Sequence, residues 1–524
     1  MGWLRLRTML RYRHRLGFMT YFLLLLLVLV VWTYHGRAGR SLDKMLEHHP
    51  LHEAQHIHLR NEEIKPRYDD ILVVRGTRNK LVESAVFSQK VYASNHSHPV
   101  KPVPPVADIP VTQKGLETPC KTVRMVEFFG QKLTLSGDPL CQWLDSTTMM
   151  ADNRFVLYAN KMALLYDVIV DPDARQTGPK GGEKMEEVWG QDEQSEYLHL
   201  KDGFFTLQCK SKPSAHFAVP KDHLNEWLAS VQCVDNTTTA VKTDPLNTVR
   251  GLTIAVQRYE YVNLYHTMTD FFNAFLTMIM FNQHPDDVTI LWVDAHPQGG
   301  LDDVWDTLFG KVIRAGRLPS KTRFNSMAWA AMGYNSPLNE HSRPSVSYLE
   351  EFRHFFLSRY GVDGTRKANC SSLNFLFIWR RDYTAHPRNK GGSISRKVDN
   401  EDQLMNAVRD VIAPGDNLHG LQLDALSMQE QLQLIAGTDV LVGMHGAGLS
   451  HTLFLPPHGG LLELYPTYWP QANRHFRAMA GWRGLHYQTW QNHDSRNEKE
   501  NHRTYIPPEV VVKMVKEIRK NICG

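Results

Sequence analysis

The segment Val440-Leu-Val-Gly-Met-His-Gly-Ala-Gly-Leu449 joins an apolar run to a cluster of glycines. This pattern predicts a buried strand, a tight turn and the start of a helix. A second apolar run, Leu461-Leu-Glu-Leu-Tyr465, predicts the next strand, with Glu463 near its end. In such a βαβ unit, glycines let backbone N–H groups approach an anion, and an acidic side chain further on can hold a ribose hydroxyl. The spacing departs from G-x-G-x-x-G, so it favours a nucleotide site other than an ordinary NAD site, with a closely packed turn as the alternative.

Other apolar runs of strand length alternate with helical patterns. They cover residues 251–256, 288–293 and 374–379. This alternation predicts an α/β fold with a mostly parallel sheet. The aromatic and polar segment 345–368 comes just before the strand at Asn374, which places a domain boundary near residue 370. We therefore expect two Rossmann-like domains with a cleft between them.

The N-terminus carries a membrane-anchor pattern. Five arginines within the first 15 residues precede an uncharged run, Leu16 to Tyr34. Nineteen uncharged residues can span a bilayer as a helix, and the arginines favour a cytosolic N-terminus. The alternative is a cleaved signal peptide, whose apolar core is normally shorter and is followed by a small-residue cleavage site. A single-pass, type II anchor is therefore predicted.

The 524 residues are too many for one hydrophobic core. The predicted organisation is a cytosolic tail at 1–15, an anchor at 16–34, a lumenal stem at 35–115, a first domain at 116–370 and a second domain at 371–524. A net charge of +4 is small for this length and implies no nucleic-acid partner. In a lumenal body the six cysteines can form disulfides, although the sequence does not choose among the pairings.

Cationic side chains follow the predicted strand 374–379. Arg380 and Arg381 come directly after it, and His386-Pro-Arg388 lies shortly beyond. Open α/β sheets bind ligands at the carboxyl ends of their strands, and a guanidinium group can hold a diphosphate through two hydrogen bonds. Adjacent residues at a strand end point in opposite directions, so we expect only one of the two arginines to face the site. The alternative is a basic surface loop.

In the first domain, His266 and Asp270 stand four residues apart at the start of a helical pattern. On a helix they share one face, close enough for a hydrogen bond that sets the imidazole tautomer or tunes the carboxylate. Either group can take a proton from an attacking hydroxyl. A structural His–Asp pair at a helix start explains the spacing equally well.

Two acidic patterns are less specific. Asp171-Pro-Asp173 follows the strand-like run 166–170 and has the D-x-D form that holds manganese in some sugar transferases. Asp-Pro-Asp also makes a good turn. Asp294 and His296 end another predicted strand, where they either line the cleft or close a turn. The residues do not decide between these interpretations.

Five blocks in this sequence resemble glycosyltransferase family 61, most closely the plant β-1,2-xylosyltransferases of the N-glycan core. The blocks are Gly181-Gly-Glu-Lys-Met-Glu-Glu-Val188, Arg258-Tyr-Glu-Tyr-Val-Asn-Leu-Tyr-His-Thr-Met-Thr-Asp270, Arg380-Arg-Asp-Tyr-Thr-Ala-His-Pro-Arg388, Gly443-Met-His-Gly-Ala-Gly-Leu449 and Gly481-Trp-Arg-Gly-Leu-His-Tyr487. The resemblance implies a GT-B architecture, with the donor nucleotide-sugar held mainly by the second domain and the acceptor facing the first. It also implies inversion at the sugar carbon.

Matching positions then take expected roles. The donor diphosphate would contact His445, Gly446, Ala447 and Gly448, with Arg380 or Arg381 on its charge and Glu463 on the ribose. The block around His266 points toward the reaction centre, and we expect Asp270 to act as the base with His266 as its helper. Asp171-Pro-Asp173 has no counterpart in the plant blocks. No metal or other cofactor is expected, because cationic side chains and helix N-termini can handle the diphosphate, although manganese use is left open.

The resemblance leads to one function and two rivals. We expect transfer of xylose from UDP-xylose to the core β-mannose of N-glycans on glycoproteins, by an enzyme anchored in the Golgi membrane. The first rival is a transferase of the same family that adds N-acetylglucosamine from its UDP-sugar to protein O-glycans. The second is an inactive lumenal glycan-binding protein. The donor sugar cannot be read from these residues.

Overall fold

The computed structural model describes residues 125–128, 131–134, 148–151, 154–158, 162–212, 223–234 and 247–524. These residues belong to one compact unit, residues 79–524. The predicted tail, anchor and stem, residues 1–115, lie outside the described residues and stay predictions. Within the described residues, no helix has the length and apolar character needed to cross a membrane.

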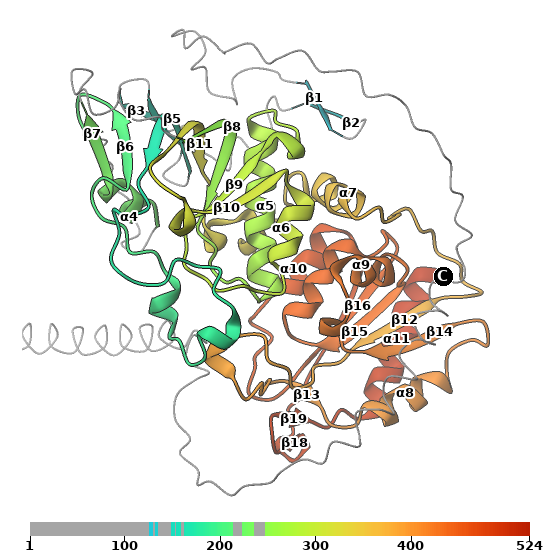
Figure 1. Ribbon diagram of the computed structural model, residues 1–524. Coiled ribbons are helices and arrows are strands. Elements are labelled where there is room, and N and C mark those ends of the chain that lie inside the picture. The colour runs from blue at the N-terminus through green and yellow to red at the C-terminus, as the bar shows by residue number, and fades with distance from the viewer. Residues whose placement is uncertain are drawn as a thin grey trace, which may run out of the picture. The chain divides into compact units, whose positions relative to one another are not determined.

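A nine-stranded mixed sheet forms the first half of the described chain (Figure 1). Its strands are β3 (Thr148–Ala151), β4 (Phe155–Tyr158), β5 (Met162–Val170), β6 (Phe205–Gln208), β7 (Val231–Val234), β8 (Asn247–Val256), β9 (Thr289–Trp292), β10 (Lys311–Arg314) and β11 (Thr322–Trp329). The order is β10-β9-β8-β11-β5-β4-β3, with β6 and β7 attached beside β5. β10, β9, β8 and β11 are parallel, whereas β5, β4 and β3 are antiparallel. The mostly parallel sheet expected from the sequence is therefore found in only part of this half.

The second sheet is entirely parallel and has the order β14-β12-β15-β16-β17. Its strands are β12 (Asn374–Ile378), β14 (Asn417–Leu421), β15 (Val440–Met444), β16 (Gly460–Tyr465) and β17 (His486–Gln491). Two small sheets join β1 (Met125–Phe128) to β2 (Gln131–Thr134), and β13 (Lys397–Val398) through β19 (Arg503–Thr504) to β18 (Glu498–Lys499). The strands predicted at 440–442 and 461–465 are confirmed as β15 and β16.

The strand order reverses once in each sheet. In the first, the chain runs from β8 outward to β9 and β10 and then returns to the other side of β8 as β11. In the second it runs from β12 to β14 and returns to the other side of β12 as β15. Ligands of open α/β sheets bind beyond the carboxyl ends of the strands at such switch points. The two crevices therefore lie after β8 and β11, and after β12 and β15.

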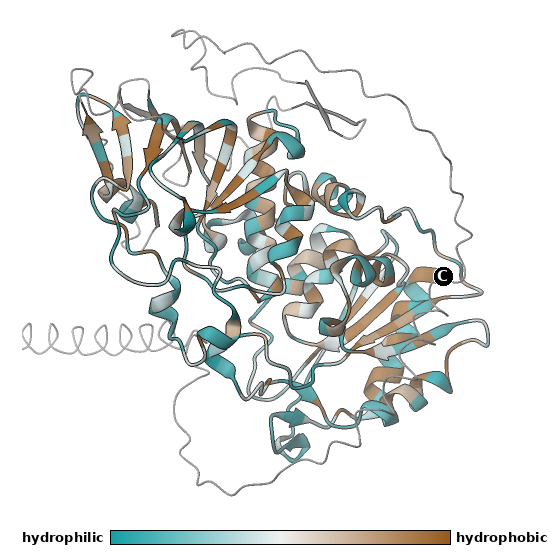
Figure 2. Cartoon of the chain, viewed as in Figure 1, coloured by the Kyte–Doolittle hydropathy of each residue, from teal (hydrophilic) through white to brown (hydrophobic). Residues whose placement is uncertain are grey.

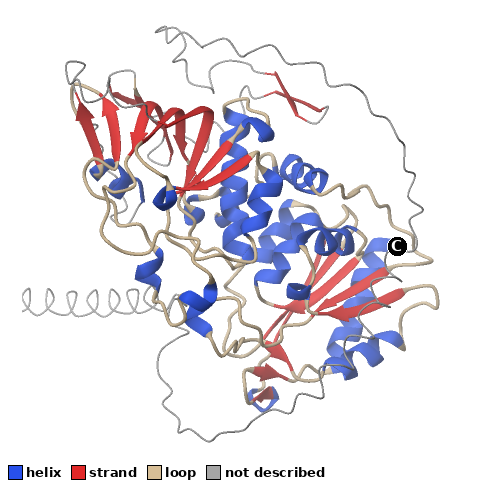
Figure 3. Ribbon diagram, in the orientation of Figure 1, coloured by secondary structure: helices blue, strands red, loops and turns tan. Residues whose placement is uncertain are grey.

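Helices cover both sheets (Figure 3). The α-helices are α4 (His223–Ala229), α5 (Leu264–Met280), α6 (Asp302–Leu308), α7 (Leu349–Arg359), α8 (Glu401–Arg409), α9 (Met428–Ala436), α10 (His475–Trp482) and α11 (Pro508–Cys523). The 3₁₀ helices are η3 (Met185–Glu187), η4 (Glu193–Glu196), η6 (Pro285–Asp287), η7 (Ala315–Arg317), η8 (Gly333–Asn335), η9 (Pro337–Asn339), η10 (Pro387–Asn389), η11 (Leu423–Ala425), η12 (Ala447–Phe454) and η13 (Ser495–Asn497). The helix predicted after the glycine turn is thus the 3₁₀ helix η12.

One apolar core lies between the two sheets. It combines side chains of α5 and α7 with side chains of η12 and α10. Figure 1 shows these helices between the sheets, and Figure 2 shows the apolar strands that they cover. Along β12, Leu376 and Ile378 enter this shared core, whereas Phe375 and Phe377 enter a separate core under α8 and α11. Burial on both faces explains why these strands are continuous apolar runs in the sequence.

α5 is the centre of the shared core. The side chain of Asn263 caps its first turn by accepting the N–H of Tyr265 at 3.0 Å. Sixteen of its 17 residues are buried, and His266 is the exception. α5 therefore meets solvent at His266, its one residue that is not buried.

The described residues contain two disulfides. Cys209 pairs with Cys233 across β6 and β7, and Cys370 pairs with Cys523 at a separation of 153 residues. The second bond joins the predicted domain boundary to the end of α11. Cys120 and Cys141 lie outside the described residues.

Candidate functional site

The glycine turn lies at the switch point of the second sheet. β15 ends at Met444, His445 and Gly446 form the turn, and η12 begins at Ala447. A Cβ on Gly446 would lie 2.8 Å from Cζ of Arg380. Only a glycine at this position lets the guanidinium group of Arg380 rest against the turn.

The two arginines after β12 point in different directions, as the strand alternation predicts. Arg380 lies against the turn and donates from Nε to the carbonyl of Ser395 at 3.0 Å. Arg381 points away and forms an ion pair with Glu401 on α8. Arg380 is therefore the arginine that faces the crevice between β12 and β15.

His445 is held from behind by a buried carboxyl group. Its Nδ1 lies 2.6 Å from Oε1 of Glu463, and the hydroxyl of Tyr487 donates to Oε2 at 2.8 Å. Glu463 is fully buried, and its two oxygens are occupied by these protein groups. In the structure the carboxyl group of Glu463 therefore positions the ring of His445. A ribose could reach this carboxyl group only if His445 and Tyr487 both moved away.

Burial controls the protonation of this pair. It raises the pKa of Glu463 to about 8, against the opposing hydroxyls of Tyr487 and Tyr465. The pKa of His445 lies well below its usual value, because the ring is buried and Arg396 and Arg380 are near. At neutral pH Glu463 is then protonated and donates to Nδ1. The hydrogen of His445 sits on Nε2, which has no hydrogen-bond partner among the described residues and can donate to an anion.

A chain of aromatic side chains links the turn to the first half of the molecule. The ring of His445 stacks 5.8 Å from His475 on α10, and His475 lies 4.3 Å from Tyr265 on α5. His341 bridges the last two, with Nε2 at 3.0 Å from Nδ1 of His475 and 2.8 Å from the hydroxyl of Tyr265. Because Tyr265 precedes His266 on α5, the chain connects the turn with the predicted catalytic block.

His266 and Asp270 do not form the hydrogen bond expected from their spacing. Oδ2 of Asp270 accepts the backbone N–H of Tyr259 at 3.3 Å, and Oδ1 faces Gly333. Asp270 is 1% exposed, and burial raises its pKa well above the usual value. Burial lowers the pKa of His266 to about 4, so its imidazole is neutral at physiological pH. Asp270 therefore braces two loops, while His266 is the group that reaches the surface.

Asp294 and His296 close a buried turn. Asp294 accepts two hydrogen bonds from Arg258, at 2.9 and 2.8 Å. Burial would raise the pKa of Asp294, but the charge of Arg258 outweighs it and holds the pKa at about 2. Nε2 of His296 lies 3.1 Å from the carbonyl oxygen of Arg258, and its Nδ1 lies 3.1 Å from Glu196. Of the two interpretations left open by the sequence, the structure supports the turn.

The basic loop after β12 docks on acidic residues of the first half. Arg388 pairs with Glu193 at 3.0 Å and with Glu260 at 3.3 Å, and His386 lies 3.5 Å from Glu196. The ion pairs of Arg388 offset its positive charge. The cationic groups beside the turn are consequently Arg380 and Arg396.

Asp171-Pro-Asp173 forms a turn. Oδ1 of Asp171 accepts the N–H of Asp173 at 3.0 Å, and Oδ2 pairs with Lys321 at 3.2 Å. In the part of the chain that the structure describes, no group of three or more histidine, cysteine, aspartate or glutamate side chains is arranged to hold a metal ion.

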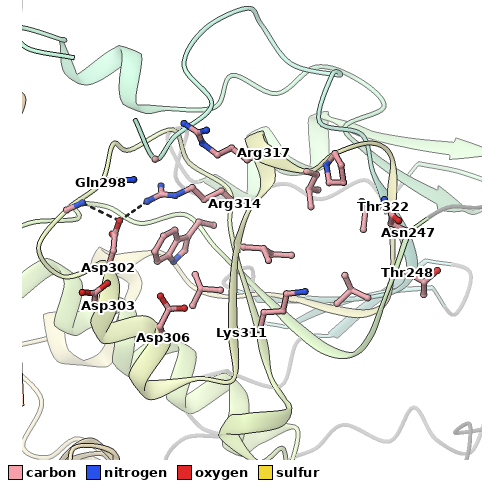
Figure 4. A pocket seen from close by; sticks show the side chains of 18 residues that line it. Asn247, Thr248, Gln298, Asp302, Asp303, Asp306, Lys311, Arg314, Arg317 and Thr322 are labelled. Atoms are coloured by element: carbon pink, nitrogen blue, oxygen red, sulfur yellow. Dashed lines mark hydrogen bonds and ion pairs between the residues drawn. The ribbon is translucent and has the colours of Figure 1, made fainter. Parts of the chain in front are cut away.

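A groove of about 1080 Å³ opens beside β10, away from the predicted site (Figure 4). Asp302, at one end of it, binds Arg314 at 2.7 Å and the N–H of Gly299 at 3.2 Å. The guanidinium groups of Arg258 and Arg314 both lie over the ring of Trp292, at 3.8 and 4.5 Å from its centroid. None of the predicted site residues lines this groove.

Several side chains of the site carry no signal in a single sequence. Arg396 stacks 4.1 Å above Trp469 and, with Arg380, affects His445 electrostatically. His341 and His475 are isolated histidines that come together only in the fold. Tyr487 ends one of the family-like blocks, which was the one available indication of its role.

Residues 264–462 match the model of the Glycosyltransferase 61 family. Over these residues the chain is similar to the family 61 glycosyltransferases. The matched range begins at the first residue of α5 and ends within β16, so it includes His266, Asp270, Arg380 and the glycine turn. The matched range therefore also includes the aromatic chain from Tyr265 to His445, apart from His475.

The chain is similar to two plant enzymes and one animal enzyme. It is 25% identical to a β-1,2-xylosyltransferase of Arabidopsis thaliana, over 66% of this chain and 74% of the relative. Identity to a β-1,2-xylosyltransferase of Oryza sativa subsp. japonica is also 25%, over 59% and 63%. An EGF domain-specific O-linked N-acetylglucosamine transferase of Gallus gallus is 27% identical, over 52% of this chain and 50% of its own length. A solved flavo di-iron protein of Thermotoga maritima, with a TM-score of 0.20 and 6% identity over 40% of this chain and 43% of its own, does not bear on the fold.

The raised pKa of Glu463 predicts that the stability of the protein depends on pH. The folded pKa is about 8 and the usual value is 4.5, so between these pH values the unfolded chain ionises while the folded chain does not. The free energy of unfolding should therefore fall as pH rises through this window, by at most about 1.4 kcal/mol per pH unit. Glu463→Gln removes the titrating group and should flatten this fall. Denaturant unfolding of both proteins at pH 5 to 8 measures the difference, with exposed Glu500→Gln as the control. Parallel curves for wild type and Glu463→Gln would contradict this prediction.

Proposed function

We propose that this chain is an inverting glycosyltransferase that moves xylose from UDP-xylose to the core β-mannose of N-glycans in β-1,2 linkage. The main support is the placement of Arg380 against the glycine turn, with His445 beside it, at the switch point of the second sheet. The similarity to plant β-1,2-xylosyltransferases over 66% of the chain supports the choice of sugar. Two Rossmann-like sheets that share one core are the basis for proposing a GT-B arrangement.

The donor diphosphate would lie on the second sheet. Arg380 supplies positive charge, Nε2 of His445 donates a hydrogen bond, and the backbone N–H groups of Ala447 and Gly448 belong to the start of η12. These groups are fixed before the reaction, so they can stabilise the charge that develops on the departing UDP without reorganisation. With such cationic and amide contacts the reaction needs no metal.

The acceptor would approach from the first sheet. Its hydroxyl oxygen attacks the anomeric carbon of the donor while the bond from that carbon to the diphosphate oxygen breaks. The electron pair of that bond leaves with UDP, and the hydroxyl proton passes to a base. We assign this base to His266, which is neutral and reaches the surface, and we give Asp270 the positioning of the surrounding loops.

The cellular setting is part of the same proposal. The N-terminal pattern of arginines and uncharged residues supports a type II anchor in the Golgi membrane, which would place the catalytic body where N-glycans are processed. The disulfides Cys209–Cys233 and Cys370–Cys523 agree with an oxidising lumen.

The rival donor is UDP-N-acetylglucosamine, because the Gallus gallus relative transfers that sugar. Incubation of the lumenal fragment from Thr112 with a panel of UDP-sugars and a trimmed N-glycan should give a product heavier by one pentose. A product heavier by one N-acetylhexosamine would replace xylose with the rival sugar. Absence of any product with every donor would favour a glycan-binding protein. Product mass and UDP release are the two measurements.

The arginine pair offers a matched test of the donor site. Arg380→Ala should weaken UDP binding by about tenfold or more, because a charge-assisted hydrogen bond is lost. Arg381→Ala, which removes an exposed ion pair with Glu401, should change the affinity by less than about twofold. Titration calorimetry with UDP measures both variants. An equal loss of UDP affinity in the two variants would mean that the diphosphate does not bind at the turn.

A second pair tests the base. His266→Gln should lower kcat by about 10²- to 10⁴-fold with UDP affinity unchanged, since proton transfer is lost. Asp270→Asn replaces a protonated carboxyl group with a neutral amide of the same shape, so the expected loss in kcat is below about tenfold. If Asp270→Asn were the inactive variant and His266→Gln the active one, Asp270 would be the base, as the sequence first indicated.

A further inference from the structure

Three large hydrophobic side chains are exposed within the described residues, and one of them lies at the crevice of the first sheet. They are Tyr334, Tyr383 and Tyr468. Tyr334 belongs to η8, which follows β11, and Tyr259 comes three residues after β8. Since β8 and β11 flank the switch point, the loops that carry these two tyrosines meet there, with ring centroids 4.4 Å apart.

His266 completes the cluster. Its ring lies 4.9 Å from that of Tyr259 and 5.5 Å from that of Tyr334. Tyr334 remains 43% exposed although it contacts both neighbours. Tyr334 therefore packs against both rings and still exposes part of its aromatic side chain beside the proposed base.

The cluster is rigidly supported. Asp270 accepts the N–H of Tyr259 and faces Gly333, the residue before Tyr334. A Cβ on Gly333 would lie 3.1 Å from both Thr269 and Tyr259, so the loop packs closely on α5. A buried carboxyl group thus fixes both tyrosine-bearing loops, which is how a binding surface is kept ready for its ligand.

We propose that Tyr334, with Tyr259 and His266, forms a platform on which one sugar ring of the acceptor glycan stacks. This inference rests on the proposed function and specifies its acceptor class: the enzyme recognises a sugar residue, and an unglycosylated serine or threonine of a protein does not suffice. The platform belongs to the first sheet, whereas the donor groups belong to the second, so the two substrates do not compete for it.

Sugar chemistry suits this surface. One face of a mannose ring carries several C–H groups, which pack against the flat face of a tyrosine, while its hydroxyls need polar partners at the ring edge. The hydroxyl of Tyr259 and the imidazole of His266 supply such partners within the cluster. Stacking at Tyr334 would also bring a hydroxyl of the bound sugar close to His266.

The kinetic test uses the lumenal fragment, its donor and a trimannosyl N-glycan core. Tyr334→Ala should raise the acceptor KM by about tenfold, with the donor KM and UDP affinity unchanged. Tyr334→Phe keeps the ring and should stay within about twofold of wild type. Tyr383→Ala, a tyrosine of similar exposure in the second half, should leave the acceptor KM unchanged. A wild-type acceptor KM in Tyr334→Ala, or an equal rise in Tyr383→Ala, would overturn the platform.

A binding measurement separates this inference from the proposed reaction. Saturation-transfer NMR of the trimannosyl core without donor should show contact at sugar C–H protons in wild type and Tyr334→Phe, and lose it in Tyr334→Ala. If that result is obtained and no donor gives product, the platform stands and the transferase assignment fails. If transfer is seen only to a serine or threonine of an unglycosylated EGF-like domain, or if the NMR contact persists in Tyr334→Ala, the platform is wrong.

Discussion

The apolar packing of α5 against η12 and α10 is the constraint on which the site depends. Each sheet has its own switch point, and neither crevice alone contains both a cationic turn and a surface histidine. The shared core packs helices of the two sheets against one another, and the rings of Tyr265 and His475 extend this contact toward the glycine turn. A loss of packing in α5 would therefore separate the two halves of the site before it disturbed either sheet.

Around the turn, the protein places polar groups where water is excluded and gives each one a partner. Burying an unpaired carboxyl group would cost several kcal/mol, and the hydrogen bonds of Glu463 to His445 and Tyr487 offset that cost. Arg258 and Asp294 likewise pair with each other where they are buried beside the first sheet. These buried pairs set ring orientation and loop position, which is why the proposal assigns ligand contacts to Arg380, His445 and His266 instead.

The sequence predicted the elements of the site better than their assembly. Continuous apolar runs identified β8, β12, β15 and β16, because strands buried on both faces are mostly apolar. Arg380 and Arg381 could also be told apart from the sequence, because adjacent residues at a strand end point in opposite directions. The burial of Asp270 and Glu463 was harder to predict, since burial is a property of the packed core and both carboxyl groups stand in motifs that also suit exposed ligands. The pairing of His341 with His475 joins residues 134 positions apart, which no local pattern encodes.

The disulfide between Cys370 and Cys523 has a topological consequence. It joins the point where the chain enters the second sheet to the last turn of α11, so residues 370–523 form a covalent ring that encloses the whole second sheet. A protease that cut one loop within this ring would leave both fragments tethered. Tension applied at the C-terminus would be carried to the boundary at residue 370 and would not peel α11 from the sheet. The last turn of α11 is thereby held by a covalent bond, as both ends of a helix inside the chain are.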